Sequence, residues 1–249
     1  MSSQIVGPLG ILSLQKGATP REFPEPHPEH LEMFVGVPLI LEDVAGAWAE
    51  DIILGNPDLE EACIAAARRL VKRGAAVITS NCGFFVRHQI AVAASVGVPV
   101  VTSSLLLAPM LLRQLSRDAK LAVLTADARH CSMDLLGLDS PNDRARVVIA
   151  GIEGSKVLDE MNADYMPQSR VTPQLTDRAA LEEEVVARLD RLRAEHPEIG
   201  AVLLECTGFP LVAPAIRSSA RLPVYDITDL CRMTLSTAYM ASGGGENRA

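Results

Sequence analysis

The segment Ala75–Phe84 reads Ala-Ala-Val-Ile-Thr-Ser-Asn-Cys-Gly-Phe and carries a cysteine directly after a short apolar run. A second segment, Gly200–Phe209, reads Gly-Ala-Val-Leu-Leu-Glu-Cys-Thr-Gly-Phe and follows the same plan. Both Cys82 and Cys206 are followed 17 positions later by a proline (99 − 82 and 223 − 206). We therefore interpret the two segments as one strand–cysteine–helix unit that occurs twice in the chain.

Around this repeat, short apolar runs alternate with helical stretches, as in βαβ units with parallel sheets. Strands are expected over residues 5–14, 33–41, 75–80, 99–103, 121–125, 147–152, 201–205 and 224–227. Helices are expected over residues 59–72, 84–96, 105–115, 129–136, 176–195, 210–219 and 228–240. The sequence predicts an α/β fold of two similar open parallel-sheet lobes, related by internal pseudo-twofold duplication, with the active site in the cleft between them.

The predicted lobes divide the chain near its middle. The first lobe is expected to span residues 1–105, with residues 215–241 packing back onto it, and the second to span residues 106–214. The tail, residues 242–249, contains three consecutive glycines and is expected to be disordered.

Composition excludes several classes of protein. The 249 residues are 48% hydrophobic and carry a formal net charge of −8 without a dense Lys/Arg run, which argues against a nucleic-acid partner. No apolar run approaches membrane-spanning length, and the N-terminus lacks the features of a signal peptide. Five scattered cysteines without a CxxC pair do not form a disulfide framework, so we expect a cytoplasmic protein with reduced thiols.

The repeated cysteines occupy a position suited to chemistry. Ligands bind at the carboxyl ends of strands in open α/β sheets, and a helix N-terminus lowers the pKa of a nearby thiol. The alternative is that each cysteine is a small buried hydrophobe. Two thiols on opposite faces of one α-carbon can remove and return its proton, so Cys82 and Cys206 are the predicted catalytic pair, without a cofactor.

The same strand ends supply candidate groups for binding a small carboxylate substrate. Some are short donors and others are glycines that allow close approach of the backbone. The predicted substrate-binding residues are Ser13, Ser80, Asn81, Gly83, Thr125, Thr207 and Gly208. The stretch around Thr125 has a second, equally good interpretation, in which the neighbouring Asp127 caps a helix and Thr125 does not bind substrate.

Three other sequence features can be explained by structure rather than by function. The segment 19–30 contains four prolines, which exclude regular helix or central strand, and is either a substrate-contacting lid or a surface connection. Arg87 and His88 lie more than a helical turn beyond Cys82, so a packing or solvated role is favoured. The pair His130-Cys131 lacks further spaced ligands, and we predict no metal site.

The motifs Asn81-Cys82-Gly83-Phe84 and Glu205-Cys206-Thr207-Gly208-Phe209-Pro210 resemble the two cysteine motifs of the aspartate/glutamate racemase superfamily. The resemblance implies a two-lobed α/β enzyme, often a dimer, that works without pyridoxal phosphate and uses both cysteines. Gly208 stands where glutamate racemases have histidine and many aspartate racemases have an acid. A small residue at this position is more similar to the motif of the hydantoin-racemase branch.

From these residues we expect a cofactor-independent isomerase, a racemase or epimerase acting on an amino acid or a hydantoin-like derivative. A homodimer is the expected assembly. One alternative is a lyase, decarboxylase or cis–trans isomerase of the same superfamily that uses a single cysteine as proton donor or nucleophile. Another is a two-lobed protein that binds a small molecule without catalysis.

Overall fold

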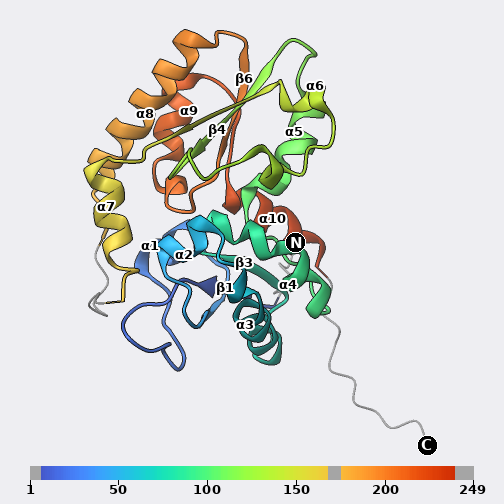
Figure 1. Cartoon of the computed structure of the whole chain (residues 1–249), viewed down its shortest axis with the longest axis vertical. Coiled ribbons are helices and arrows are strands. Elements are labelled where there is room, and N and C mark those ends of the chain that lie inside the picture. Colours follow the sequence, from blue (N-terminus) through green and yellow to red (C-terminus); the bar gives the residue numbers. More distant parts are fainter. Residues whose placement is uncertain (1–6, 168–174, 239–249) are drawn as a thin grey trace, which may run out of the picture.

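Two parallel sheets, one in each half of the chain, form the framework of the molecule (Figure 1). The computed structural model describes residues 7–167 and 175–238. The first sheet has the order β2-β1-β3 and consists of β1 (Leu9–Ser13), β2 (Leu39–Asp43) and β3 (Val77–Ser80). The second has the order β5-β4-β6-β7 and consists of β4 (Lys120–Thr125), β5 (Val147–Gly151), β6 (Ile199–Leu204) and β7 (Val224–Tyr225).

The two sheets share one strand order. The predicted fourth strand of the first sheet, over residues 99–103, is reduced to a single parallel bridge between Val100 and Ile78. Val100 pairs with β3 in the first sheet as β7 pairs with β6 in the second. The predicted α/β fold with two parallel sheets is therefore confirmed. Each cysteine follows the third strand of its sheet.

Helices connect the strands and cover the sheets. In the first half they are α1 (Pro28–Met33), α2 (Ala49–Leu54), α3 (Glu60–Lys72), α4 (Gln89–Ser95) and α5 (Ala108–Gln114). In the second half they are α6 (Pro141–Arg144), α7 (Lys156–Ala163), α8 (Arg178–Glu195), α9 (Ala213–Ala220) and α10 (Ile227–Thr237). Short 3-10 helices are η1 (Pro57–Leu59), η2 (Gly83–His88), η3 (Ser104–Leu107), η4 (Met133–Leu136) and η5 (Phe209–Leu211).

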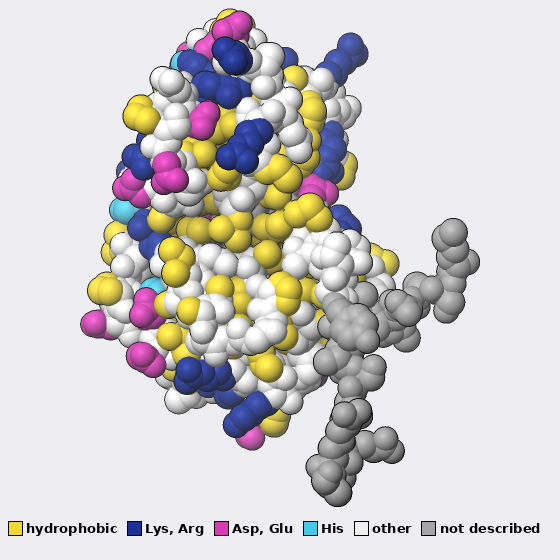
Figure 2. Space-filling model, turned by 90° about the vertical axis from the view of Figure 1, so that its right-hand side faces the viewer, with side chains coloured by type: hydrophobic (Ala, Val, Ile, Leu, Met, Phe, Trp, Pro, Cys, Tyr) yellow, Lys and Arg dark blue, Asp and Glu magenta, His cyan; other side chains and the backbone are white. Residues whose placement is uncertain are grey.

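The last described helix returns to the first half of the molecule, where α10 lies against β3 and η3 (Figure 1). The predicted domain boundaries stay a prediction, and the predicted disordered tail at 242–249 lies outside the described residues. Figure 2 shows apolar side chains gathered across the middle of one face, where the two halves meet. None of the helices within the described ranges has the length and hydrophobicity needed to span a bilayer.

Local chemistry corrects three sequence predictions. Residue 33 was expected to open a strand, but α1 ends there and β2 begins only at Leu39. The proline-rich segment was expected to exclude helix, yet α1 starts at Pro28, because a proline fits the first turn of a helix. The helix expected over residues 129–136 is shortened to η4, since Asp127 binds the Arg129 amide and guanidinium and holds a turn there.

Candidate active site

Two loops at the carboxyl ends of β3 and β6 carry the two repeated cysteines. We call residues 81–83 the first cysteine loop and residues 205–208 the second cysteine loop. Cys82 is the residue before η2, and Cys206 lies two positions beyond the end of β6. Both thiols are free and half-buried, and both line one pocket of ≈ 160 Å³. A charge on Cys206 would raise the pKa of Cys82, the smallest of the influences on that thiol.

Burial decides the state of the two thiols. It raises the pKa of Cys206 to about 12 and raises that of Cys82 well above its ordinary value, and Glu205 adds to both shifts. Backbone N–H groups oppose the shift: Gly208 and Phe209 face Cys206, while Phe84 faces Cys82. The backbone N–H groups after each cysteine thus lower the thiol pKa, as expected from their position, but desolvation outweighs them.

The polar residues of the two cysteine loops bind one another. Asn81 accepts a hydrogen bond of 2.8 Å from the Leu14 amide through Oδ1 and donates one of 3.2 Å to Ser13 Oγ. Thr207 Oγ1 donates a hydrogen bond of 2.5 Å to the Asn81 carbonyl. The structure thus brings Asn81 and Thr207 together at the pocket, in a hydrogen-bonded junction between the two cysteine loops.

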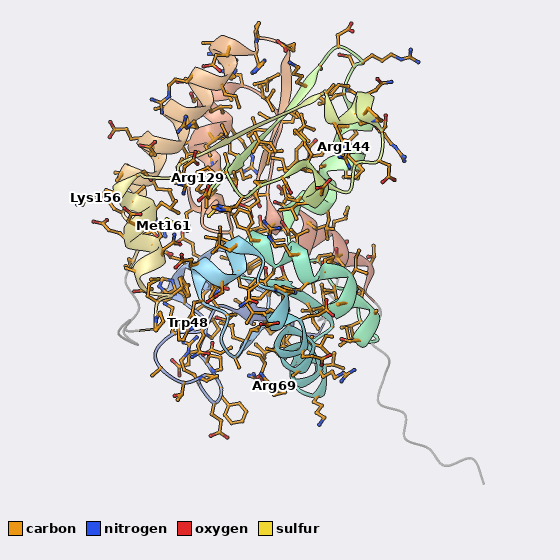
Figure 3. All side chains as sticks on the ribbon, in the orientation of Figure 1. Trp48, Arg69, Arg129, Arg144, Lys156 and Met161 are labelled. Atoms are coloured by element: carbon orange, nitrogen blue, oxygen red, sulfur yellow. The ribbon has the colours of Figure 1, made fainter. Side chains whose placement is uncertain are left out.

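The two glycines beside the cysteines allow close packing. A Cβ atom placed on Gly83 would lie 2.3 Å from Glu205 Oε1 and 2.4 Å from the Glu205 carbonyl oxygen. A Cβ atom on Gly208 would lie 2.4 Å from Cε of Met161, which α7 brings to the boundary between the lobes (Figure 3). Both glycines line the pocket, and each leaves room for a side chain from another element.

Three predicted binding residues lie behind the pocket wall rather than among its described lining residues. Ser13 supports the Asn81 side chain, as described above. Ser80 Oγ donates a hydrogen bond of 2.6 Å to the backbone carbonyl oxygen of Thr102. Thr125 Oγ1 donates a hydrogen bond of 2.7 Å to Glu205 Oε2. All three are buried, and the hydroxyl group of each is hydrogen-bonded to another group of the protein.

Glu205 is the site residue that sequence reasoning missed. It lines the pocket and is 1% exposed. Burial raises its pKa to about 7, against the opposing effects of the Thr125 hydroxyl and the Ala126 amide. A signal was present in the sequence, because a carboxylic acid stands next to Cys206 at the end of a run that is otherwise apolar.

The outer wall of the pocket comes from α1, α7 and the residues around them. The proline-rich segment reaches the pocket through His27, Glu29 and His30. Four acidic residues contribute to this wall, and they are Glu29, Glu160, Asp164 and Asp177. No lysine or arginine occurs among the described lining residues. Lys16 lies behind the wall, 2.8 Å from Asp164 Oδ2 and 4.5 Å from the centroid of the Tyr165 ring.

The other residues considered from the sequence lie elsewhere. Arg87 donates a hydrogen bond of 2.7 Å to the His130 carbonyl oxygen and so joins the two halves of the chain. His88 is buried, and burial lowers its pKa. Cys131 is also buried. None of these four residues is among the described lining of the pocket.

The fold of this chain is that of the aspartate/glutamate racemase superfamily, as the sequence predicted. Allantoin racemase from Klebsiella pneumoniae superposes with a TM-score of 0.61 at 13% identity, over 97% of this chain and 94% of that one. Glutamate racemase from Francisella tularensis, in complex with D-glutamate, gives a TM-score of 0.54 at 13% identity, over 94% and 81% of the two chains. An aspartate racemase homologue from Pyrococcus horikoshii gives 0.51 at 20% identity, over 92% and 97%.

Curated proteins of similar sequence are named as lyases and not as racemases. The chain is 32% identical over 169 residues to a dimethylsulfoniopropionate lyase of Durusdinium sp. clade D, which covers 62% of this chain and 50% of that protein. It is 30% identical over 202 residues to dimethylsulfoniopropionate lyase 5 of Emiliania huxleyi, covering 77% and 38%. The chain thus spans half or less of the length of these relatives. No family model matches it.

These relatives correct the predicted function. The expectation of a racemase or epimerase, and with it the isomerase class, is wrong, because the curated relatives are lyases. The physical reason is that racemisation and elimination can begin with the same step, the removal of a proton beside a carboxylate. Whether the resulting carbanion is reprotonated or expels a leaving group depends on the substrate, and the thiol motifs alone do not encode that difference.

Proposed function

We propose that this chain is a carbon–sulfur lyase that acts on dimethylsulfoniopropionate or a closely related β-sulfonio carboxylate. The observation that carries the proposal is the pocket in which Cys82, Cys206 and an acidic outer wall meet. The names of the curated relatives support the same reaction class and the substrate.

The proposed reaction is a β-elimination. A base takes the proton from the α-carbon, the electron pair of that C–H bond forms the second bond between the α- and β-carbons, and the bond from the β-carbon to sulfur breaks. Dimethyl sulfide leaves as a neutral molecule with the electron pair of that bond, and acrylate remains. The leaving group needs no proton, so the reaction requires one base rather than the acid–base pair of a racemase.

Cys206 is the better candidate for that base. Its thiolate faces two backbone N–H groups, those of Gly208 and Phe209, whereas Cys82 faces only that of Phe84. Both thiols are protonated in the free protein at neutral pH. A bound sulfonium cation favours ionisation of a nearby thiol, because an opposite charge within a few ångströms lowers its pKa. In this scheme Cys82 shapes the opposite side of the site.

The outer wall suits the cationic end of such a substrate. Glu29 presents a carboxylate at the pocket, whereas Asp164 and the Tyr165 ring, which also line it, already interact with the Lys16 ammonium group. Carboxylates and aromatic faces are the groups that attract sulfonium and quaternary ammonium ions. No lysine or arginine is among the described lining residues, and Lys16, which lies behind the wall, is paired with Asp164.

The test is incubation of the purified protein with dimethylsulfoniopropionate, with dimethyl sulfide measured by gas chromatography and acrylate by liquid chromatography. We expect equal amounts of the two products. Cys206→Ser should lower kcat by at least about 10²-fold, as for loss of a general base. Cys82→Ser should lower it less, and Cys63→Ala, which removes a buried thiol of α3, serves as the control. Absence of both products, or full activity in Cys206→Ser, would overturn the proposal.

Further properties expected from the sequence belong to this proposal. We propose that the enzyme works without a bound cofactor, forms a homodimer, resides in the cytoplasm and has no nucleic-acid partner. Size-exclusion chromatography with light scattering measures the assembly directly. Activity of protein that has been dialysed against chelator measures the need for a metal.

A further inference from the structure

Glu205 has one carboxyl oxygen held by the protein and one that is not. Thr125 Oγ1 donates to Oε2 at 2.7 Å, and the Ala126 amide also faces the carboxyl group. Oε1 is buried and has no hydrogen-bond partner among the described residues. A buried polar atom in this state costs about 1–3 kcal/mol unless a ligand satisfies it.

Oε1 lies between the two cysteine loops. Glu205 stands next to Cys206 in the chain, and its Oε1 and carbonyl oxygen pack against Gly83, the neighbour of Cys82. The residue also lines the pocket. The unpartnered oxygen therefore belongs to a residue of the pocket wall and lies beside the neighbour of Cys82.

The surroundings of Glu205 favour the neutral acid. Four titratable groups interact electrostatically with Glu205, and they are Cys82, Cys131, Cys206 and Arg87. Burial raises the pKa of all three cysteines, so they remain uncharged near pH 7, and the Arg87 cation acts on Glu205 only as a minor opposing influence. Since Oε2 already accepts from Thr125, a proton on the carboxyl group is best placed on Oε1.

We propose that Glu205 acts as a neutral acid that donates a hydrogen bond from Oε1 to the carboxylate of the substrate and keeps this bond while negative charge builds there. This inference rests on the proposed function for the identity of the substrate. No proton leaves Glu205 in the step: the α-proton passes to the Cys206 sulfur, and the electron pair passes through the carbon framework to the leaving group.

Two considerations give this hydrogen bond its importance. The described lining of the pocket offers the substrate carboxylate no lysine or arginine, so neutral donors must hold it. A bound carboxylate also disfavours ionisation of Glu205, because a second negative charge beside it is repelled. A donor aimed at developing oxyanion charge contributes about 10²- to 10³-fold to the rate.

The matched variants are Glu205→Gln and Glu205→Leu. In Glu205→Gln the amide oxygen can accept from Thr125 and the Ala126 amide, which leaves the NH₂ group at the place of Oε1 as a donor that does not titrate. We expect Glu205→Gln to keep kcat/KM within about tenfold of the parent value, and Glu205→Leu to lose about 10²-fold or more. The parent activity should carry a decline above pH 7 that Glu205→Gln lacks.

A binding experiment with propionate, which has no leaving group, separates this inference from the proposed function. Calorimetric titration at pH 8 in phosphate and in Tris buffers measures the protons taken up on binding. We expect the parent protein to take up close to one proton per propionate bound, because Glu205 must be neutral in the complex. Glu205→Gln should bind propionate with no uptake.

The outcomes are distinguishable. Proton uptake that disappears in Glu205→Gln, even in a protein that releases no dimethyl sulfide, supports the role of Glu205 and removes only the substrate assignment. Binding of propionate without proton uptake overturns the inference, and so does a failure of propionate to bind at all. Equal activity of Glu205→Leu and the parent protein overturns it as well.

Discussion

Thr207 Oγ1 donates a hydrogen bond of 2.5 Å to the backbone carbonyl of Asn81, and this bond joins the second cysteine loop to the first. Asn81 in turn holds the Leu14 amide at 2.8 Å and Ser13 Oγ at 3.2 Å. A continuous chain of hydrogen bonds thus runs from the second cysteine loop through the first to the end of β1.

Removing this junction should reduce stability and activity together. Thr207→Val keeps the volume of the side chain and leaves the Asn81 carbonyl without its partner. We expect the free energy of unfolding in urea to fall by about 1–2 kcal/mol. The rate of dimethyl sulfide release should fall about tenfold or more, because small errors in the position of reacting groups are costly. Thr237→Val, at an exposed position on α10, is the control and should change neither quantity.

The two glycines of the cysteine loops should respond differently to alanine. At Gly208 the added methyl group meets Cε of Met161, the flexible end of a long side chain, at 2.4 Å. Met161 can move, so Gly208→Ala should raise KM by narrowing the pocket while leaving the melting temperature nearly unchanged. The double variant Gly208→Ala with Met161→Ala should recover KM, and additive effects of the two changes would contradict direct contact.

At Gly83 the added methyl group meets Glu205 Oε1 at 2.3 Å and its backbone oxygen at 2.4 Å. A backbone atom cannot move aside without disturbing β6, so Gly83→Ala should lower the free energy of unfolding by about 1–3 kcal/mol. Chemical denaturation of the two alanine variants side by side measures the difference. Equal stability of both would show that Glu205 is not packed against Gly83.

Some of this site follows from the sequence and some does not. Apolar runs that end in Cys82 and Cys206 suffice to predict two parallel sheets, because buried parallel strands have that composition. They do not predict Glu29 or Asp164, since α1 and α7 reach the pocket through tertiary packing that leaves no local pattern. The hydroxyl of Ser80, a predicted binding residue, donates to the Thr102 carbonyl oxygen, and the sequence does not predict this contact because a short hydroxyl at a strand end can bind either backbone or ligand.

Glu205 should make stability depend on pH in a defined direction. Burial raises its pKa from 4.5 to about 7, so ionisation costs the folded state more than the unfolded chain. The full stability is present below pH 4.5 and is lost as the pH rises toward 7 and beyond. Glu205→Gln removes that loss, and we expect it to be more stable than the parent at pH 8 by roughly 3 kcal/mol.

At pH 4 the same variant should differ little from the parent protein. Urea denaturation at the two pH values gives both numbers, and Glu182→Gln on the exposed face of α8 is the control. A parent protein that is as stable as Glu205→Gln at pH 8 would mean that the Glu205 carboxylate is stabilised by partners in solution. The proposed hydrogen bond to substrate would then lose its basis.

The acidic outer wall should distinguish substrates by their cationic end. Glu29 on α1 lines the pocket, with its side chain 12% exposed and two hydrogen bonds from Thr176. Glu29→Gln keeps the shape of the side chain and removes its charge. We expect KM for dimethylsulfoniopropionate to rise about three- to tenfold, because an opposite charge near a desolvated cation contributes on the order of 1 kcal/mol.

The same α1 helix supplies a matched control for this change. Glu32 lies one turn further along and pairs with Arg178 at the surface, and it is not among the described residues that line the pocket. Glu32→Gln should leave KM unchanged. Affinity for propionate, which lacks the cation, should be unaltered or slightly higher in Glu29→Gln, since a negative charge has been removed near an anion. An equal loss of affinity for propionate and for dimethylsulfoniopropionate would mean that Glu29 shapes the pocket without recognising the sulfonium group.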